Sequence, residues 1–582
     1  MPNTRTKAAR RKANGEPDAP NVEAVKALQA VFDPLGSMTS LFKAQQDWAR
    51  HPGEFMRAMD RLAVEADTLQ RHAWRRALGL QEDDAVKAVE GDERFAAPEW
   101  SNNPFFSLMK QSYLGYTRWL EHTVFHTPEM PKDERTRAAF WTKQWFNALA
   151  PTNFFFTNPV AIQKYFDSHG ESVKRGLRNW AEDKRVGDVQ MVDSKSFSVG
   201  KNLATTPGSV VFRNELIELI RYAPMTETVH AVPLVLIPPW INKFYILDLN
   251  EKKSMVRYLL RQGYSVFVVS WKNPDASMSK TTMDDYTIKG ALAAIEAARA
   301  ICDVPQVHAV GYCLGGTTLA MLMAWLSREY EKKPGMPVAH WTTLATLTDF
   351  SRPGEIEIFL NEDGLRTVEE TLERQGFLDG REMSRTFRML RPNSLIWHYY
   401  VHSYLYGEAP PALDVLYWNT DTTRLPAAMH SFYLRNFYVK NLLAQKDGLT
   451  IAGHPIDLGR IKQPLYAVGT EEDHITPWKG TFKSSTLVGG PVRYVLSTSG
   501  HILGIINPPV HPPKRAYWVG KREHDMDHKE WRAKHAQVPG TWWEDWDKWL
   551  AERCGPMQAP PPVARPPHQV LCAAPGTFVV EH

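Results

Sequence analysis

One cysteine stands in a pattern that could make it a nucleophile. Residues 307–320 read VHAVGYCLGGTTLA, which predicts a short apolar strand, a glycine-rich turn around Cys313 and the start of a helix. Gly311-Tyr312-Cys313-Leu314-Gly315 has the glycine–x–nucleophile–x–glycine spacing of a tight strand-to-helix turn. A helix N-terminus aimed at the thiol would favour a thiolate and any oxyanion beside it. A buried structural cysteine between two ordinary glycines fits the same five residues, because short motifs recur by chance.

Two later residues could activate Cys313. A predicted strand, Leu465–Val468, runs into a loop that carries Asp473, and a second, Val492–Leu496, runs into a loop that carries His501. The chain order of nucleophile, acid and histidine is that of α/β-hydrolases. Loops at the carboxyl ends of parallel strands meet at one edge of a sheet. Alone, Asp473 could cap a turn and His501 could lie on a surface loop. Together the three predict a Cys–His–Asp triad.

An acyl-transfer site also needs donors for an oxyanion. The backbone N–H of Leu314, directly after the nucleophile, is one candidate. The second is expected in the loop after an earlier strand, Leu234–Ile237, which continues as Pro-Pro-Trp-Ile-Asn-Lys over residues 238–243. Prolines have no N–H, so the candidates are Trp240 and Ile241. The sequence does not choose between them.

The elements that must position these residues alternate between strand and helix from about residue 188 onward. Short β-branched runs are typical of strands buried on both faces of a parallel sheet, and a helix is expected between them at Asp284–Ala300. The alternation predicts an α/β fold with right-handed crossovers. The expected early strands are 210–212, 216–222, 234–237, 266–270, 307–310 and 342–347.

Three further regions complete the predicted organisation. Residues 1–22 form a basic arm expected to be disordered, and residues 23–187 form a helical domain ahead of a catalytic domain at 188–582. Residues of about 350–443 are dense in aromatics and lack the alternation, so they are predicted to be a cap over the active site. The tail after Leu550 is Pro-rich and expected to be extended.

Aromatic and apolar spacing predicts which faces are buried. Leu62, Ala66, Leu69 and Ala73 recur at helical spacing. The aromatics of the helical domain, at 100–120 and 151–159, could touch an apolar surface, but burial in a core is favoured. The tryptophans of the C-terminal region are expected to form one helix face docked on the catalytic domain; they are Trp542, Trp543, Trp546 and Trp549.

Composition excludes several classes of protein. The chain has 582 residues, 43% of them hydrophobic and 23% charged, as in ordinary globular proteins. A net charge of +4 is too small to predict nucleic-acid binding. Four scattered cysteines predict neither a disulfide framework nor a zinc site. His524 and His528 could bind a metal on a helix, but their charged surroundings favour a solvated face, and no metal is expected. No apolar run reaches the ~18 residues of a membrane span, so a cytosolic protein is predicted.

Longer stretches resemble the polyhydroxyalkanoate synthases, which polymerise hydroxyacyl-CoA into a storage polyester. The resemblance spans roughly residues 95–550 and includes NLATTPGSVVFRNELIELIRY, PPWINKFYILDLN, GYCLGG, DVLYWNTDTTRLP, SFYLRN, GTEEDHI and SGHILGIINPP. The GYCLGG form is similar to the class I enzymes. The resemblance implies an α/β-hydrolase fold, Cys313 as nucleophile, His501 as general base, Asp473 as catalytic aspartate, and short-chain (R)-3-hydroxyacyl-CoA substrates such as 3-hydroxybutyryl-CoA.

The same resemblance implies partners and a location. It implies a polyester granule surface, granule-associated proteins and a homodimer whose contact maps near Trp418, in the cytoplasm at the granules. No cofactor is implied, because CoA is part of the substrate and a product. Two alternatives stay open: a cysteine thioesterase or hydrolase of the same fold, and a non-catalytic scaffold protein of polymer granules.

Overall fold

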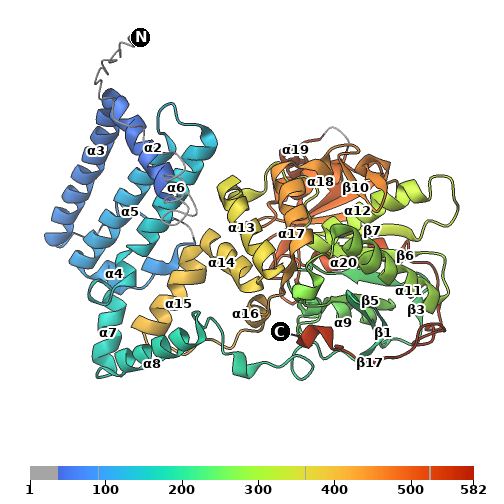
Figure 1. The fold of residues 1–582 in the computed structure, drawn as a ribbon. Helices are drawn as coiled ribbons and strands as arrows, with labels where there is room; N and C mark the ends of the chain where they lie inside the picture. Colours follow the sequence, from blue (N-terminus) through green and yellow to red (C-terminus); the bar gives the residue numbers. More distant parts are fainter. Residues whose placement is uncertain (1–36, 81, 90, 361, 524–525, 582) are drawn as a thin grey trace, which may run out of the picture.

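The computed structural model describes residues 37–80, 82–89, 91–360, 362–523 and 526–581. A helical N-terminal domain lies on one side, a large sheet with its covering helices on the other, and further helices between them (Figure 1). The fold is therefore the predicted one: an α/β-hydrolase fold with a cap insertion, preceded by helices. The arm predicted at 1–22 lies outside the described residues, as does His524.

The N-terminal helices pack mainly on one another. α3 lies along α5, while α6 packs against α2 and α5. Asn103 and Asn158 cap α5 and α7 by accepting backbone N–H groups, and each is followed by a proline at the first helical position. The helices are α2 (Ser37–Arg50), α3 (Pro52–Ala77), α4 (Glu99–Asn102), α5 (Pro104–Phe125), α6 (Lys132–Ala148), α7 (Pro159–Asp167) and α8 (Glu171–Val186).

The aromatic side chains of this domain are only partly core, so the prediction of burial was wrong for several of them. Trp100 is fully buried and packs edge-on against Phe95. Phe105, Phe154 and Phe156 are exposed, Phe156 to 86%. The reason is that the domain has little core: its buried hydrophobic clusters are small, whereas the sheet domain has one large continuous core.

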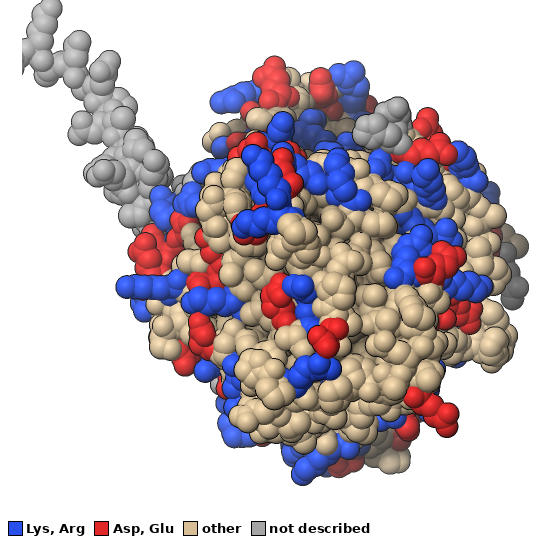
Figure 2. Space-filling view, turned by 90° about the vertical axis from the view of Figure 1, so that its right-hand side faces the viewer, with Lys and Arg blue, Asp and Glu red and all other residues tan. Residues whose placement is uncertain are grey.

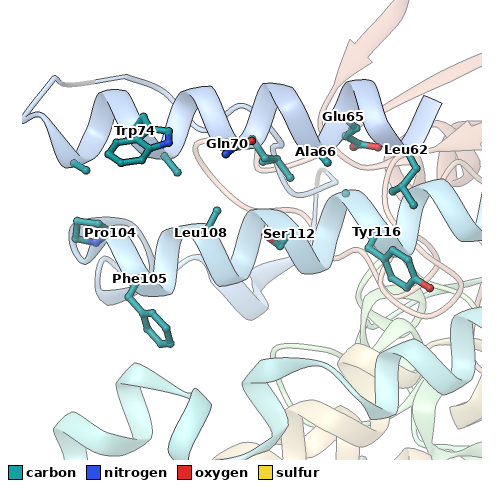
Figure 3. A pocket seen from close by; sticks show the side chains of 14 residues that line it. Leu62, Glu65, Ala66, Gln70, Trp74, Pro104, Phe105, Leu108, Ser112 and Tyr116 are labelled. Carbon is teal, nitrogen blue, oxygen red and sulfur yellow. The ribbon is translucent and has the colours of Figure 1, made fainter. Parts of the chain in front are cut away.

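An apolar groove lies between α3 and α5 (Figure 3). Its volume is about 750 Å³. Trp74 and Phe105, exposed to 66% and 63%, stand at one end, with Leu62 and Tyr116 at the other. The helical repeat Leu62, Ala66, Leu69, Ala73 thus lines a groove.

Eleven strands form the central sheet, in the order β15-β14-β13-β12-β7-β6-β4-β5-β2-β1-β17. The run from β5 to β13 in this order is parallel, and both edges are antiparallel. All parallel strands therefore deliver their following loops to one edge. The strands are β1 (Gly208–Arg213), β2 (Ile217–Tyr222), β4 (Leu234–Ile237), β5 (Val266–Trp271), β6 (Val307–Tyr312), β7 (Val338–Leu344), β12 (Leu465–Thr470), β13 (Val492–Ser497), β14 (Ala516–Lys521), β15 (Gln537–Pro539) and β17 (Cys572–Ala573).

Two predicted elements differ from the structure. The strand expected at 342–347 is β7, which begins at Val338 and ends at Leu344 because Ala345 has a positive φ of 45° and turns the chain. The helix expected at Asp284–Ala300 contains a π-helical segment at Tyr286–Leu292, where Gly290 packs so closely that a Cβ would lie 2.5 Å from the Trp271 ring.

Helices cover both faces of the sheet (Figure 1). The predicted tryptophan face is confirmed: all four tryptophans of α20 are buried, and the Trp546 indole donates to Thr342 Oγ1 on β7 at 3.0 Å. Figure 2 shows the face that forms the right-hand side of Figure 1, where basic and acidic side chains are interspersed, in keeping with the small net charge. The helices are α9 (Met255–Arg261), α10 (Met283–Asp285), α11 (Ala293–Cys302), α12 (Leu314–Glu329), α18 (Trp478–Thr486), α19 (His528–Lys534) and α20 (Trp542–Ala551).

The segment between β7 and β12 is mostly helical and joins the two halves of the molecule. Its base is a two-stranded ribbon of β8 (Phe377–Leu378) and β9 (Leu425–Pro426). The N-terminal domain docks on it, since Gln144 Nε2 donates to the Met389 carbonyl at 2.9 Å and Asn179 Nδ2 to the Ser403 carbonyl at 3.1 Å. Its helices are α13 (Glu362–Gln375), α14 (Gly380–Leu390), α15 (His398–Tyr400), α16 (Asp414–Thr420) and α17 (Ala427–Tyr433).

The C-terminal tail ends in a docked segment, which its Pro-rich sequence did not predict. Strand β17 pairs with β1, and Phe578 and Val579 are buried. The fully buried Glu218 carboxylate accepts the backbone N–H groups of Thr577 and Phe578 at 2.9 and 3.1 Å. The tail is thereby fixed to the sheet.

A pair of buried histidines, one on β6 and one on the neighbouring strand β7, should make stability depend on pH. His308 and His340 contact each other through Nδ1, and burial lowers the pKa of His308 well below its usual range and that of His340 to about 4. Unfolded histidines bind a proton near pH 6.5, so the unfolded state takes up protons first and stability falls as pH drops below that value. We expect about 2 kcal/mol lost per histidine at pH 5. Denaturant unfolding at pH 7.5 and pH 5 measures it. An equal loss in His340→Gln would contradict this account.

Candidate active site

The turn that carries Cys313 has the strained geometry its sequence predicts. β6 ends at Tyr312, and α12 begins at Leu314 with Cys313 as its N-cap. Cys313 has φ 51° and ψ −120°, a conformation that ordinary side chains rarely adopt. Its N–H donates to the Leu344 carbonyl of the neighbouring strand at 2.8 Å, which fixes the turn. The buried thiol is therefore held at the N-terminus of α12.

Glycines permit this turn because neighbouring atoms leave no room for a Cβ. A Cβ on Gly311 would lie 2.3 Å from Gly316 Cα, and one on Gly315 would lie 2.1 Å from the Ile237 carbonyl oxygen. The first turn of α12 is thus pressed against the end of β4. The glycine spacing in the sequence reflects these two contacts.

The substitution Gly315→Ala should therefore disrupt the elbow. We expect the free energy of unfolding to fall by about 3 kcal/mol or more, since the backbone atoms it would meet cannot move away cheaply. The matched control is Gly53→Ala, also in the first turn of a helix, where a Cβ meets nothing within 4 Å. Denaturant unfolding of both variants tests this; equal effects would contradict it.

The structure brings Asp473 and His501 into direct contact. Both lie on loops that follow parallel strands, β12 and β13, as expected. His501 Nδ1 donates to Asp473 Oδ2 at 2.7 Å, and its ring lies close enough to the Cys313 side chain for the two to interact. All three residues are at least nine-tenths buried.

Asp473 is held as a carboxylate by several donors. Its Oδ2 also accepts the hydroxyls of Thr470 and Thr476, and its Oδ1 accepts the backbone N–H groups of Ile475 and Thr476, each at 2.8 Å. Burial alone would raise its pKa, but the His501 charge and these hydrogen bonds hold the pKa of Asp473 below its usual range. An ionised carboxylate fixes the His501 ring with Nδ1 protonated.

His501 is a strong base in this setting. Burial opposes its charged form, yet the charges of Asp473 and Cys313 and the hydrogen bonds to both raise the pKa of His501 well above its usual range. Tyr312 stacks on the ring with centroids 5.7 Å apart, and its hydroxyl donates to the His501 carbonyl at 3.3 Å. The site can therefore take a proton from the thiol and hold it beside the nucleophile.

The three oxyanion candidates lie around the same turn. Leu314 opens α12, and the loop with Trp240 and Ile241 leaves β4, whose end touches Gly315. Within the described residues no carbonyl accepts the N–H of Leu314, Trp240 or Ile241.

Two tyrosines from the cap segment come close to Cys313, and the sequence did not single them out. Tyr433 donates to the Tyr438 hydroxyl at 3.0 Å, and both rings are close enough for the Cys313 charge to act on them. Burial raises the pKa of Tyr438 to about 12. Tyr433 lies in the SFYLRN stretch that carried part of the resemblance, and this was the available signal. Trp240 packs edge-on against Tyr433 at 5.3 Å, so this aromatic group connects the cap segment to the loop with the oxyanion candidates.

The chain matches two described families. Residues 232–508 match the family described as "alpha/beta hydrolase fold", and residues 91–259 match "Poly-beta-hydroxybutyrate polymerase (PhaC) N-terminus". The fold thus defines a member of the α/β-hydrolase superfamily, and this member carries a cysteine on the turn between β6 and α12.

Curated relatives narrow this class. The chain is 39% identical to the poly(3-hydroxyalkanoate) polymerase of Methylorubrum extorquens over 93% of this chain and 89% of that protein. It is 40% identical to the poly(3-hydroxyalkanoate) polymerase subunit PhaC of Cupriavidus necator, over 84% of this chain and 83% of that protein. The corresponding subunit of Rhizobium meliloti is 36% identical, over 96% of this chain and 91% of that protein. This chain belongs to the poly(3-hydroxyalkanoate) polymerase family.

The described part of the chain shows neither a metal-binding cluster nor a membrane-spanning helix. No group of three or more His, Cys, Asp or Glu residues there is placed to hold a metal ion. None of the described helices combines the length and the apolar character that crossing a membrane would require.

Proposed function

We propose that this chain polymerises (R)-3-hydroxyacyl-CoA thioesters, short-chain ones such as 3-hydroxybutyryl-CoA, into polyhydroxyalkanoate with release of CoA. Two observations together support the proposal. Relatives named as poly(3-hydroxyalkanoate) polymerases align with this chain over most of their length. In addition, the side chains of Cys313, His501 and Asp473 lie together in one site. The residue roles of the proposal are Cys313 as nucleophile, His501 as general base and Asp473 as the group that orients it.

In the first step the thiol proton moves to His501 and the Cys313 sulfur attacks the thioester carbonyl. The tetrahedral oxyanion accepts hydrogen bonds from Leu314 N–H and from Trp240 or Ile241 N–H. When it collapses, the C–S bond to CoA breaks and the CoA sulfur takes the proton from His501. Cys313 then carries the acyl group as a thioester.

In the second step a substrate hydroxyl group, and not water, attacks the acyl-enzyme and receives the acyl group. The 3-hydroxyl of a further hydroxyacyl-CoA attacks the acyl-Cys313 carbonyl and gives its proton to His501; the ester bond forms, the thioester breaks, and the displaced Cys313 thiolate takes the proton back from His501. The lengthened acyl-CoA then returns to Cys313 by the first step and releases CoA. Water must be kept away for this to succeed. The buried rings of Tyr433 and Trp240 and the partly buried ring of Tyr438, which lie near the thiol, support this part of the proposal. No cofactor enters either step.

The test is to give the purified protein 3-hydroxybutyryl-CoA and measure both free CoA and the acyl product. Insoluble polyester as the main product supports a polymerase. Free 3-hydroxybutyrate as the main product would establish a thioesterase instead. Granule binding without CoA release would establish a scaffold protein. Repeating the assay with C3 to C8 hydroxyacyl-CoAs defines the acyl-length preference.

The proposal extends to a polyester granule surface in the cytoplasm as the site of action, with a homodimer as the working form and granule-associated proteins as further partners. Trp418, near the expected dimer contact, is itself buried in the protomer. A homodimer contact near it would therefore use surrounding residues. Sedimentation of the purified protein, and a fluorescent fusion in polymer-producing cells, test these two points.

The groove between α3 and α5 is the proposed contact with the polyester surface. Replacing Trp74 and Phe105 by serine removes two exposed rings at one end of it, and should weaken binding to isolated granules at least about tenfold. The matched control is Phe166→Ser with Leu177→Ser, which are exposed to 66% and 61% outside the groove. Co-sedimentation with granules measures binding. Equal loss in both pairs would contradict the groove as the contact.

A further inference from the structure

Lys243 is a buried lysine next to the proposed oxyanion loop, and the acyl-transfer steps above do not use it. Its side chain is 3% exposed. Burying an ammonium group is costly unless it is paired and hydrogen-bonded. Lys243 Nζ lies 2.7 Å from Asp421 Oδ1 and donates to the Glu581 carbonyl at 3.1 Å. Its partners therefore come from two distant parts of the chain, the segment after α16 and the C-terminal tail.

The backbone around Lys243 is tied to the same cap segment. The Trp418 indole donates to the Lys243 carbonyl at 2.7 Å. The Thr423 hydroxyl donates to the Trp240 carbonyl at 2.7 Å, and the Thr423 N–H to the Ile241 carbonyl at 3.3 Å. The carbonyls of Trp240 and Ile241 thus accept cap donors. The Trp240 carbonyl shares one rigid peptide plane with the Ile241 N–H, so its bond to Thr423 also orients that candidate oxyanion donor.

Further contacts close the network. Tyr245 OH donates to Asp421 Oδ2 at 2.8 Å, so both carboxylate oxygens are used. Asn273 Nδ2 donates to the Glu581 carbonyl at 3.4 Å, while its Oδ1 accepts the Arg424 N–H at 2.9 Å. The C-terminal end lies beside α16 (Figure 1). The Lys243 ammonium group is therefore the point where three segments meet: the loop of residues 238–243, the base of the cap and the C-terminal tail.

We infer that Lys243 is a positioning residue for acyl transfer. Through its bonds to Asp421 and Glu581 it fixes the loop of residues 238–243 to the cap and to the C-terminal tail, and this loop supplies the second oxyanion donor. The inference rests on the proposed function. Lys243 does not touch the reacting atoms. It acts through the backbone of residues 240–243, so its loss should slow the chemical step and leave substrate binding largely unchanged.

Three variants test this. Lys243→Met keeps the length of the side chain without its charge, and should lower kcat for CoA release from 3-hydroxybutyryl-CoA about 10- to 100-fold with little change in KM. It also leaves Asp421 buried without its partner, so some stability should be lost. Adding Asp421→Asn removes that unpaired charge and should restore most of the stability while kcat stays low. Lys253→Met is the matched control, since Lys253 forms another lysine–aspartate pair with the cap, to Asp414 at 2.7 Å, but is 42% exposed.

The outcomes separate the inference from the proposed function. A low kcat in the restabilised double variant, with Lys253→Met near wild type, supports Lys243 as a positioning residue. Wild-type kcat in the double variant would show that Lys243 only stabilises the fold and would overturn the inference while the polymerase stands. Equal kcat losses in Lys243→Met and Lys253→Met would also overturn it. Wild-type protein without any CoA release would overturn both.

Discussion

Replacing Cys313 by alanine is expected to lower the rate of CoA release from 3-hydroxybutyryl-CoA by roughly 10⁴-fold or more. The reason is that no acyl-enzyme can form without the sulfur, and the remaining groups only bind and polarise the substrate. The fold should remain, because the Cys313 side chain makes no capping hydrogen bond that alanine would lose and only one buried atom is removed. A continuous thiol assay for CoA measures the rate, and circular dichroism checks folding.

The matched control is Cys302→Ala, at the end of the helix that precedes the elbow strand. Cys302 is also buried, and burial raises its pKa to about 11, which makes it a poor nucleophile. Its loss should leave turnover near the wild-type rate. Normal turnover in Cys313→Ala, or an equal loss in Cys302→Ala, would contradict Cys313 as the nucleophile.

Replacing Asp473 by asparagine should lower kcat by about 10³- to 10⁴-fold. The carboxylate fixes His501 with Nδ1 protonated and stabilises its charged form. Both Asp473 oxygens accept donors, whereas an amide accepts only through its oxygen, so the substituted side chain would have to present its NH₂ group to donors at one end. The pH dependence of kcat/KM should change as well, because the pKa of His501 falls when the adjacent charge is removed.

Thr476→Val is the control for this prediction. It removes one hydroxyl hydrogen bond to Asp473 and the 3.2 Å contact of the same hydroxyl with His501 Nδ1, but leaves the carboxylate charge, the Asp473–His501 hydrogen bond and the backbone donors in place. We expect a rate loss of no more than about tenfold. If Thr476→Val were as slow as Asp473→Asn, the loss would reflect disrupted packing of the loop, and the electrostatic role of Asp473 would be wrong.

The arrangement of Cys313, Asp473 and His501 could be expected from the sequence because each follows a short β-branched run. Parallel strands deliver their C-terminal loops to one edge, so strand order alone brings the three residues near one another. The strain at Cys313 and the close approach at Gly315 were also predictable, since local geometry dictates residue type there.

Other features depended on tertiary partners that no local pattern encodes. The Lys243–Asp421 pair joins segments far apart in the chain, and the docking of Phe578 depends on a buried Glu218. Phe105 and Phe156 have the spacing of core residues, yet they are exposed because nothing among the described residues covers them. Helical periodicity identifies a face, whereas burial requires a partner for that face.

The central claim is that the growing acyl chain is carried on Cys313, and trapping that species tests it most directly. Protein mixed with 3-hydroxybutyryl-CoA is quenched in acid within one turnover, digested, and analysed by mass spectrometry. We predict one or more hydroxybutyryl units attached as a thioester to the peptide that contains Cys313, and none in Cys313→Ala. Polymer formation with the acyl group on a different residue, or with Cys313 unmodified throughout, would contradict the account.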